Sequence, residues 1–388
     1  MAEERRARLA MRHHLALSTR AADPVAVARS LVALHGTDAA TVFLSVAART
    51  HQPATAALER ALYDERSLVR MLGMRRTVFV VPREVAAVVQ RACTDDIALQ
   101  QRKLLVRMLQ GAGISDDVPG WLADVERSTL AALDARGEAT AQDLARDEPR
   151  LAERILLAEG KSYAGFQSVS TRILLLLSAE GKLVRARPRG TWISSQHRWA
   201  PLTAWLGSPL PNIPAAEAQA TLVRLWLRAF GPAPLEDVRW WTGLTVGQVR
   251  RALSSCGAVE VTVDGAPGYA LADDLDVTPP PGDWVALLPA LDSTVMGWSR
   301  REWFLGLHGP ALFDRNGNAG PTVWSNGRIV GGWAQRPSGE VVFRLLEEIP
   351  AEAARAVESE AARLQAWLGP TRITPRFRTP LEKELSAS

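Results

Sequence analysis

The hydrophobic and polar positions repeat the same order of elements three times along the chain. In each segment, apolar residues spaced by about 3.6 positions, as in a helix, give way to a shorter run rich in β-branched residues that ends near a glycine or a proline. These segments span residues 24–82, 121–195 and 216–272. Helices followed by a strand pair are the order found in winged helices. The pattern therefore predicts winged-helix modules in tandem.

In the first segment the period changes from helical to strand-like near its end. Helical spacing covers residues 24–34, 39–50 and 54–68. Residues 69–82 predict a strand pair, because the run around Val78 is rich in β-branched and aromatic side chains. The first module thus ends in a hairpin.

The second segment has the clearest sequence of helix and wing. It predicts a helix that ends at Gly137, a helical stretch over 141–160, and an amphipathic helix that ends at Gly181. Two strand-like halves follow, 183–188 and 190–195, and we expect them to be hinged at Arg189 and Gly190.

The third segment contains a predicted helix-turn-helix. Residues 235–243 and 245–253 have the right lengths, with Gly243 at the turn and Thr245 as an N-cap. Its wing is expected at 259–272 and is acidic, whereas the wings of the first two segments are basic.

Proline-rich stretches at 208–216 and 278–283 separate the units, since proline continues neither a helix nor a central strand. After Trp284 the pattern changes to strands, with a hairpin turn at Asn326-Gly327, and then to a helix over 350–369 and a basic tail. We expect a mostly α fold with β wings (α+β), in which winged-helix modules and a C-terminal β-rich domain are arranged in tandem. The predicted domains are 1–85, 86–207, 208–279 and 280–388.

Composition excludes several classes of protein. With 47% hydrophobic residues the chain can bury a core in each unit, and no apolar run reaches the roughly 18 residues of a membrane helix. The N-terminus has no signal-peptide pattern, so we expect a cytoplasmic protein. Cys93 and Cys256 have no CxxC partner and are expected in the core. The histidines show no zinc-binding spacing and no phosphate-binding glycine motif occurs, so neither a metal nor a nucleotide is indicated.

Basic residues gather on the predicted wings. The net charge is only +4, but residues 181–216 contain no acidic residue. Alternation places Arg185, Arg187 and Arg189 on one face of a strand, where a wing can follow DNA phosphates. A solvated arginine row without a partner is the alternative. The arginines that we expect to contact double-stranded DNA are Arg70, Arg75, Arg76, Arg185, Arg187, Arg189, Arg250, Arg251, Arg300 and Arg301.

The chain has 13 tryptophans, some of which could stack on bases, although tryptophan is more often core. The candidate catalytic residues are His35, Thr37 and Asp38. A purely structural interpretation has Gly36 ending a helix, Thr37 or Asp38 capping the next, and His35 in the last turn, where a cation suits the helix dipole. The alternative is that His35, titrating near neutrality, and Asp38 position and deprotonate a water.

At this junction the sequence resembles the AlkZ/YcaQ type of winged-helix DNA glycosylase. The family usually has Gln-Φ-Gln or Gln-Φ-Asp after LVxL, where this chain has residues 35–38. A second match is LLPALDSTVMGWSRREWFLGL, residues 287–307. The resemblance implies tandem winged helices in a C-shaped clamp and excision of N-alkylated purines, including bulky N7-guanine adducts, without a cofactor. It also implies that His35 and Thr37 take the places of the glutamines and that Asp38 matches the aspartate that often follows. Replacement of both glutamines changes the donors and acceptors around the water and so bears on the substrate range.

Other functions remain open from the sequence. Unequal modules in one chain favour an asymmetric monomeric clamp over a dimeric repressor. A non-catalytic DNA-binding regulator and, less favoured, a protein-interaction scaffold are the alternatives.

Overall fold

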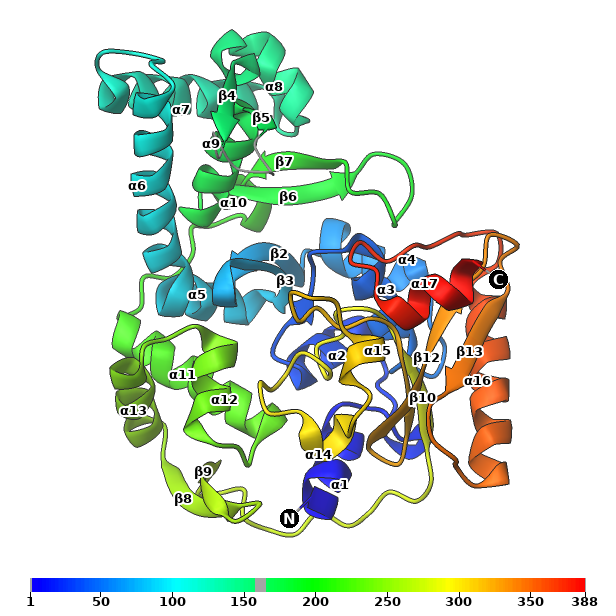
Figure 1. Cartoon of the computed structure of the whole chain (residues 1–388). Helices are drawn as coiled ribbons and strands as arrows, with labels where there is room; N and C mark the ends of the chain where they lie inside the picture. Colours follow the sequence, from blue (N-terminus) through cyan, green and yellow to red (C-terminus); the bar gives the residue numbers. More distant parts are fainter. Residues whose placement is uncertain (1, 158–164, 388) are drawn as a thin grey trace.

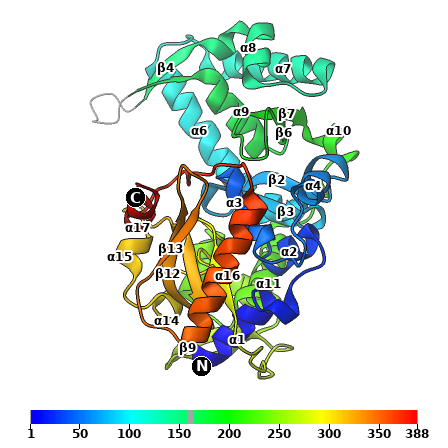
Figure 2. The same cartoon turned by 90° about the vertical axis from the view of Figure 1, so that its right-hand side faces the viewer.

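A computed structural model of the chain describes residues 2–157 and 165–387, and every structural statement refers to these residues. The long helix α6 (Asp95–Gly111) rises along one side of the molecule and joins a lower body to a smaller upper unit (Figure 1). The hairpin of strands β6 and β7 extends from the upper unit across the top of the lower body. Figure 2 shows the same separation from the side.

The first segment forms a helical unit closed by a three-stranded sheet of order β1-β3-β2. Its elements are α1 (Ala2–Arg12), a 3-10 turn (Leu17–Thr19), α2 (Pro24–Ser30), β1 (Leu34–His35), α3 (Ala39–Ala47), α4 (Thr55–Glu59), a π-helical turn (Arg60–Asp64), β2 (Leu68–Gly73), a 3-10 turn (Met74–Arg76) and β3 (Thr77–Pro82). The predicted strand pair is confirmed, with Val69 opposite Val81. The prediction that the first helix continues to Leu34 is wrong. That helix ends at Ser30, and β1 pairs antiparallel with β3, so that His35 lies opposite Phe79.

The second segment supplies α6 and the upper unit. Its elements are 3-10 turn Arg83–Val85, α5 (Ala86–Val89), a π-helical turn (Gln90–Thr94), α6, α7 (Val118–Arg136), α8 (Ala141–Asp147), 3-10 turn Pro149–Ala152, β4 (Arg154–Leu157), β5 (Gly165–Ser168), α9 (Val169–Ala179), β6 (Leu183–Pro188), β7 (His197–Pro201) and α10 (Leu202–Leu206). Gly137 ends α7 with a φ of 72°, as predicted.

Two predictions in the second segment are wrong. The stretch expected to be helical to residue 157 breaks after Asp147, and β4 pairs with β5 instead; residues 158–160 lie outside the described part of the chain. The second strand of the wing is His197–Pro201 and not residues 190–195, which form the loop between β6 and β7.

The third segment has the predicted helix-turn-helix and hairpin. Its elements are α11 (Ala215–Phe230), α12 (Leu235–Thr242), α13 (Val246–Ser255), β8 (Ala258–Val263) and β9 (Ala266–Leu271). Gly243 ends α12 in the left-handed conformation with a φ of 77°, which a residue with a Cβ adopts only at a cost. Thr245 starts α13 with a capping box, in which its hydroxyl accepts the Gln248 N–H and the Gln248 side chain accepts the Thr245 N–H.

The C-terminal region is an antiparallel sheet of order β10-β11-β12-β13 with α16 along one side (Figure 2). Its elements are β10 (Val285–Leu288), α14 (Glu302–Leu305), α15 (Gly309–Leu312), β11 (Thr322–Ser325), β12 (Arg328–Gln335), β13 (Val341–Leu345), α16 (Ala351–Leu368) and α17 (Pro380–Ala387). The predicted turn at Asn326-Gly327 is confirmed, with positive φ at both residues. The tail, expected to be merely basic, ends in α17, which packs on β12.

Hydrophobic cores do not follow the segments one by one. One cluster joins Val42 of the first segment, Trp226 of the third and Trp324 of the C-terminal sheet. A separate cluster, including Leu122 and Ile173, is confined to residues 105–183. The upper unit therefore has its own core, whereas the rest of the chain shares a core among segments far apart in sequence. Both cysteines are buried, as are the tryptophans Trp205, Trp226, Trp241, Trp284, Trp298, Trp324 and Trp333.

The loop between β6 and β7 links the upper unit to the lower body. Its Trp192 packs between Phe43 of α3 and Trp367 of α16, at ring-centroid distances of 4.9 and 5.6 Å. Ile193 lies against the same cluster. This contact explains why residues 190–195 do not continue a strand: their hydrophobic side chains are used in tertiary packing.

A fully buried ion pair fixes the C-terminal region to the first segment. Every N–H group of the Arg49 guanidinium has an acceptor, because it donates to both carboxylate oxygens of Asp292, to the carbonyls of His13 and Ser45, and to the Thr294 hydroxyl. Both side chains are 0% exposed. Burial alone raises the pKa of Asp292, but the Arg49 charge and the hydrogen bonds that Asp292 accepts lower it, and the net pKa lies below its usual range.

The pair predicts a large and specific loss of stability. We expect Asp292→Asn to lower the free energy of unfolding by about 3–5 kcal/mol, because the buried Arg49 charge then has no counter-ion. Urea unfolding at pH 7 measures this effect, and Glu358→Gln, which removes an exposed carboxylate on α16, is the matched control. A loss no greater than that of the control would contradict the assigned role of the pair.

Candidate active site

The motif loop, residues 35–38, connects β1 to α3 and is held by its main chain. The Gly36 N–H donates to the Val78 carbonyl of β3 at 2.8 Å. The His35 N–H donates to the Ser293 hydroxyl at 3.0 Å, and that hydroxyl donates to the Ala33 carbonyl at 2.8 Å. Ser293 follows Asp292 directly, so the buried ion pair also sets the position of the motif loop.

His35 is buried and not cationic. Its side chain lies edge-on to Phe79 at 5.4 Å, and its Nδ1 has no hydrogen-bond partner among the described residues. Burial, with a smaller contribution from the charge of Arg75, lowers the pKa of His35 to about 3. The expectations that His35 is a helix-terminal cation or titrates near neutrality are therefore wrong, because β1 draws the ring into the core.

Asp38 is the N-cap of α3, one of the two residues, with Thr37, that the structural interpretation of the sequence offered for this role. Its Oδ1 accepts the Ala40 N–H at 3.1 Å, and its Oδ2 accepts the N–H of Arg376, in the C-terminal tail, at 3.0 Å. The residue is half-buried, and a carboxylate retains lone pairs for a further donor. Thr37 is also half-buried, and its hydroxyl makes no hydrogen bond to another described residue. These two side chains are the polar groups of the motif loop that a substrate or water can reach.

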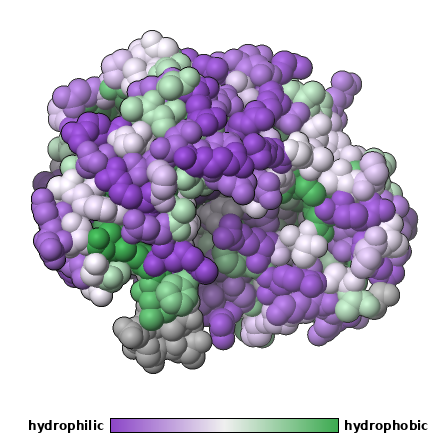
Figure 3. All heavy atoms as spheres, turned by 90° about the horizontal axis from the view of Figure 1, so that it is seen from above, coloured by the Kyte–Doolittle hydropathy of each residue, from purple (hydrophilic) through white to green (hydrophobic). Residues whose placement is uncertain are grey.

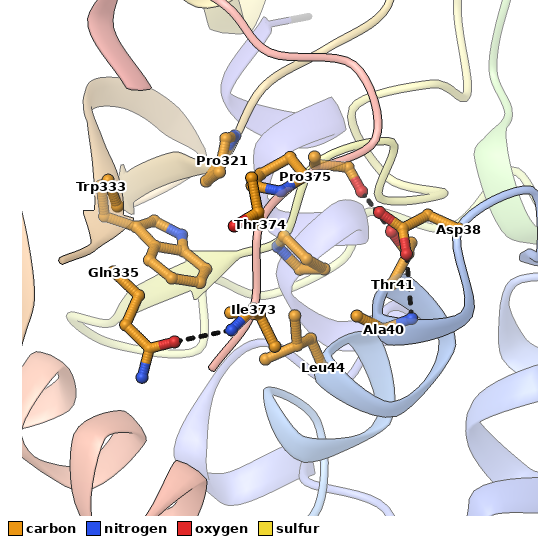
Figure 4. A pocket seen from close by; sticks show the side chains of 13 residues that line it. Asp38, Ala40, Thr41, Leu44, Pro321, Trp333, Gln335, Ile373, Thr374 and Pro375 are labelled. Atoms are coloured by element: carbon orange, nitrogen blue, oxygen red, sulfur yellow. Dashed lines mark hydrogen bonds between the residues drawn. The ribbon is translucent and has the colours of Figure 1, made fainter. Parts of the chain in front are cut away.

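A narrow, mostly apolar pocket lies beside Asp38, between α3, the sheet and the tail (Figure 4). Leu44, Trp333 and Ile373 line it, and Gln335 accepts the Ile373 N–H at 2.9 Å, which holds the tail against β12. The tail thus closes one side of Asp38.

Arg70 is buried beneath the motif loop, although it was expected to contact DNA. It is 3% exposed, and its Nη1 donates to the Gly36 carbonyl at 3.1 Å. Its Nε and Nη2 have no partner among the described residues. Burial lowers the pKa of Arg70, and the nearby charges of Tyr63 and Asp38 raise it. The position is that of a residue that holds the loop, not of one on the surface.

The wing arginines, expected to act alike, have different environments. Arg187 donates to Asp64 at 2.8 Å and lies over the ring of Tyr63. Arg189 is half exposed and lies 3.5 Å from Asp143. Arg185 has neither an ion pair nor a hydrogen bond to another described residue, and its guanidinium lies 5.4 Å from the ring of Trp199.

Arg185 and Arg189 line a hollow of about 1010 Å³, which we call the basic hollow. His197 and Trp199 of β7, Gln142 of α8 and Arg376 of the tail line it as well. Burial and the charges of Arg70 and Arg185 lower the pKa of His197 to about 3, so its imidazole is neutral. Because Arg376 lines the hollow and its main-chain N–H donates to Asp38, the hollow and the motif loop are adjacent. Seen from this end, the molecule is mostly hydrophilic, with small scattered hydrophobic areas (Figure 3).

The remaining predicted DNA-contacting arginines lie elsewhere. Arg75 and Arg301 stack on the same indole, that of Trp240, at 3.8 and 5.1 Å. The others are exposed: Arg76, Arg250, Arg251 and Arg300. In the described part of the chain, no group of three or more His, Cys, Asp or Glu residues is placed to hold a metal ion. In the same residues, no helix combines the length and apolar character that crossing a bilayer requires.

Comparisons with known proteins identify the family of the chain. The family described as DNA glycosylase AlkZ-like matches residues 28–367. The chain belongs to this family. It is 29% identical over 185 residues to an interstrand DNA cross-link repair glycosylase of Streptomyces sahachiroi, an alignment that covers 45% of this chain and 48% of that relative. The chain thus matches about half the length of this relative.

The solved structure of the Streptomyces sahachiroi DNA glycosylase AlkZ has the same fold. The TM-score is 0.72 at 20% identity, over 94% of this chain and 96% of that one. The mixed α/β architecture is therefore that of an AlkZ-like protein. The family match includes the motif loop, the hairpin β6–β7 and Asp292, and it ends before Arg376.

Several residues of the site were not identified from the sequence. Asp292 and Ser293 lie in the second stretch that resembles the family, so that stretch could have indicated a role for them. Arg376 was noted only as part of a basic tail, and nothing local to it shows that it contacts Asp38. His197 has no sequence signal at all, because its position depends on where β7 begins.

The buried histidines predict a loss of stability in mild acid. The pKa of His13, His35 and His197 is about 3 in the folded protein, mainly because burial disfavours the imidazolium, against about 6.5 when unfolded. The unfolded chain therefore binds more protons below pH 6.5, and stability that is complete above this pH falls as the pH is lowered. Each histidine contributes a slope that approaches about 1.4 kcal/mol per pH unit.

Urea unfolding between pH 6.5 and 5.0 measures this slope. In the His35→Asn variant, the free energy of unfolding should change less steeply with pH than in the wild type, because one of the three buried histidines no longer contributes. This difference in slope does not depend on the stability of the variant at pH 7. This window lies above the range in which Asp292 titrates, so the carboxylate does not contribute. An unchanged slope would show that His35 is protonated in the folded protein.

Proposed function

We propose that this protein is a monofunctional DNA glycosylase that hydrolyses the N-glycosidic bond of N-alkylated purines, with bulky N7-guanine adducts as the preferred lesions. The supporting observation is that Asp38 accepts the main-chain N–H of Arg376, a residue that lines the basic hollow, so that a DNA backbone in the hollow would bring a sugar close to Asp38. Membership of the AlkZ-like family supports the class of reaction, and the name of the relative above suggests cross-linked DNA among its substrates.

The chemistry requires little acid catalysis. Alkylation at N7 makes the purine cationic, so when the bond from N9 to C1′ breaks, its electron pair neutralises the base and no proton needs to be supplied. Positive charge then develops on the sugar, where the carboxylate of Asp38 stabilises it, and water adds to C1′ and loses its proton to Asp38 or to solvent. The Thr37 hydroxyl can donate to or accept from that water. His35 takes no proton in this scheme, because it is neutral and buried.

We further propose that the helix and hairpin units act as winged helices of a C-shaped clamp around the duplex. The hairpin β6–β7 reaches from the upper unit over the lower body (Figure 1), and Arg185 on β6 and Arg189 just after β6 line the basic hollow. One copy of the chain brings all of these groups together, so a monomer suffices.

A sequence-reading regulator is the second candidate. It is favoured by α13, the second helix of the helix-turn-helix, on which Arg250 and Arg251 are exposed. A regulator would protect one genomic sequence, whereas a repair enzyme binds undamaged duplexes with steep salt dependence and little sequence preference. Binding to random and genomic duplexes over a series of salt concentrations separates the two.

Release of free base tests the proposed activity directly. Incubation with a duplex that contains a single N7-alkylguanine should release the alkylated base and leave an abasic site, detected by chromatography and by strand cleavage in alkali. A duplex with unmodified guanine is the control. If the duplex is bound and no base is released, the enzymatic proposal fails.

The charge of Asp38 should matter to excision and not to folding. Asparagine caps a helix as well as aspartate does, so Asp38→Asn keeps the N-cap of α3. It removes the negative charge and, with it, the second oxygen that accepts the Arg376 N–H. We expect excision to fall by about 100-fold or more, in the range typical of a lost acid–base or charge-stabilising group, with little change in affinity for duplex DNA.

Asp23→Asn is the matched control for that variant, because Asp23 is the N-cap of α2 and accepts two main-chain N–H groups. It should excise at the wild-type rate. Equal losses in the two variants would point to helix capping, not chemistry, as the role of Asp38.

A further inference from the structure

The positive charges around the basic hollow are only partly neutralised by the protein. Arg185 is half-buried and has no carboxylate partner among the described residues. The side chain of Arg376 likewise has no ion pair among the described residues, and its guanidinium lies 5.9 Å from the ring of Phe377. By contrast Arg187, on the same strand, is paired with Asp64 at 2.8 Å and lies 3.6 Å from Glu59.

The hollow is therefore short of negative charge. Burial, and then the nearby charges of Arg70 and Arg376, lower the pKa of Arg185 to about 10. His197 has a buried Nδ1 without a partner among the described residues. An anion placed in the hollow would relieve the repulsion between the guanidinium groups and would meet several N–H donors. A cationic alkylated purine would add to the repulsion, so the damaged base itself does not suit this hollow.

The position of the hollow identifies which anion it would take. Arg376 joins the hollow to the site: its N–H donates to Asp38 at 3.0 Å, the residue lines the hollow, and its charge acts on Arg185. A group bound between Arg185 and Arg376 thus lies next to the sugar on which Asp38 acts. In DNA the anion nearest to a sugar is one of its own two phosphates.

We propose that the basic hollow binds a single DNA phosphodiester, one that flanks the sugar of the damaged nucleotide, through Arg185 and Arg376. This assignment rests on the proposed function for the choice of DNA as ligand. It gives Arg185 and Arg376 a task that the other wing arginine, Arg187, does not share. The phosphate fixes the register of the strand, so that the sugar is held against Asp38.

Replacing the phosphates of the damaged strand one at a time by a neutral methylphosphonate tests the proposal. The probe is a duplex with one tetrahydrofuran abasic analogue, which cannot be hydrolysed, and one methylphosphonate placed in turn at each phosphate within three nucleotides of it. Affinity is measured for the wild type and for Arg185→Gln, Arg376→Gln and Arg187→Gln. The glutamines retain hydrogen-bonding capacity and remove the charge.

For the wild type, we expect one phosphate next to the analogue to stand out, with an affinity loss of about 10-fold or more when it is neutralised, as for a lost charge-assisted hydrogen bond. In Arg185→Gln and in Arg376→Gln, the fully charged duplex should bind more weakly, and neutralising that same phosphate should cost little more. The slope of log affinity against log salt should fall by about 1. Arg187→Gln should give the wild-type profile.

The opposite results would overturn the assignment. If the losses from the variants and from every methylphosphonate simply add, the arginines act through general charge and the hollow is not a phosphate site. If Arg187→Gln gives the same affinity profile as Arg185→Gln, the ion pairs of Arg187 do not distinguish it from Arg185, and the assignment to Arg185 fails. The readout is binding to an analogue, so it does not depend on base release. If the protein excises the alkylated base but no single phosphate stands out in binding, only this inference is refuted. If one phosphate stands out in binding but no base is released, only the proposed activity is refuted.

Discussion

The buried pair of Arg49 and Asp292 is the interaction on which the candidate site depends. Placing two charges where neither has any contact with water is unfavourable unless every donor and acceptor is used, and here every N–H of the guanidinium has an acceptor. The pair joins the residue that follows the C-cap of α3 to the segment before α14, and the two partners are more than 240 positions apart in sequence. Through Ser293 it extends to the main chain of the motif loop. The loop is therefore fixed from below by a rigid polar network, and not by its own short-range turn.

The upper face of the loop is built from two elements that come from different regions of the chain. The hairpin β6–β7 reaches over from the upper unit, and Trp192 at its end packs between Phe43 and Trp367. The C-terminal tail passes on the other side and meets Asp38 with a main-chain N–H. The hairpin and the tail both carry arginines. The packing that holds these two elements against the lower body therefore also brings positive charge near the carboxylate of Asp38.

This arrangement divides the motif residues by depth. His35 is in the core as a neutral ring, and Arg70 lies beneath the loop, while Thr37 and Asp38 are only half-buried. A cationic leaving group needs a nearby negative charge and a positioned water more than it needs an acid. In the function that we propose, the Asp38 carboxylate and the Thr37 hydroxyl would meet that need.

Local features of the chain were predictable from the sequence because they depend on neighbouring residues. The turn between α12 and α13 requires a left-handed residue and a capping side chain, and Gly243 and Thr245 supply them. A cap at Thr37 or Asp38 was predicted for the same reason, and Asp38 is that cap. Tertiary structure decided the rest. His35 lies in a strand because β3, some forty residues later, offers a pairing edge, and its pKa follows from that burial. Arg185 and Arg187 are equivalent in the sequence pattern. The carboxylates of Asp64 and Glu59, both from the first segment, pair with Arg187, whereas Arg185 has no carboxylate partner among the described residues. Periodicity determines which face of a strand a side chain takes, but charge, burial and partners depend on what the rest of the chain packs against that face.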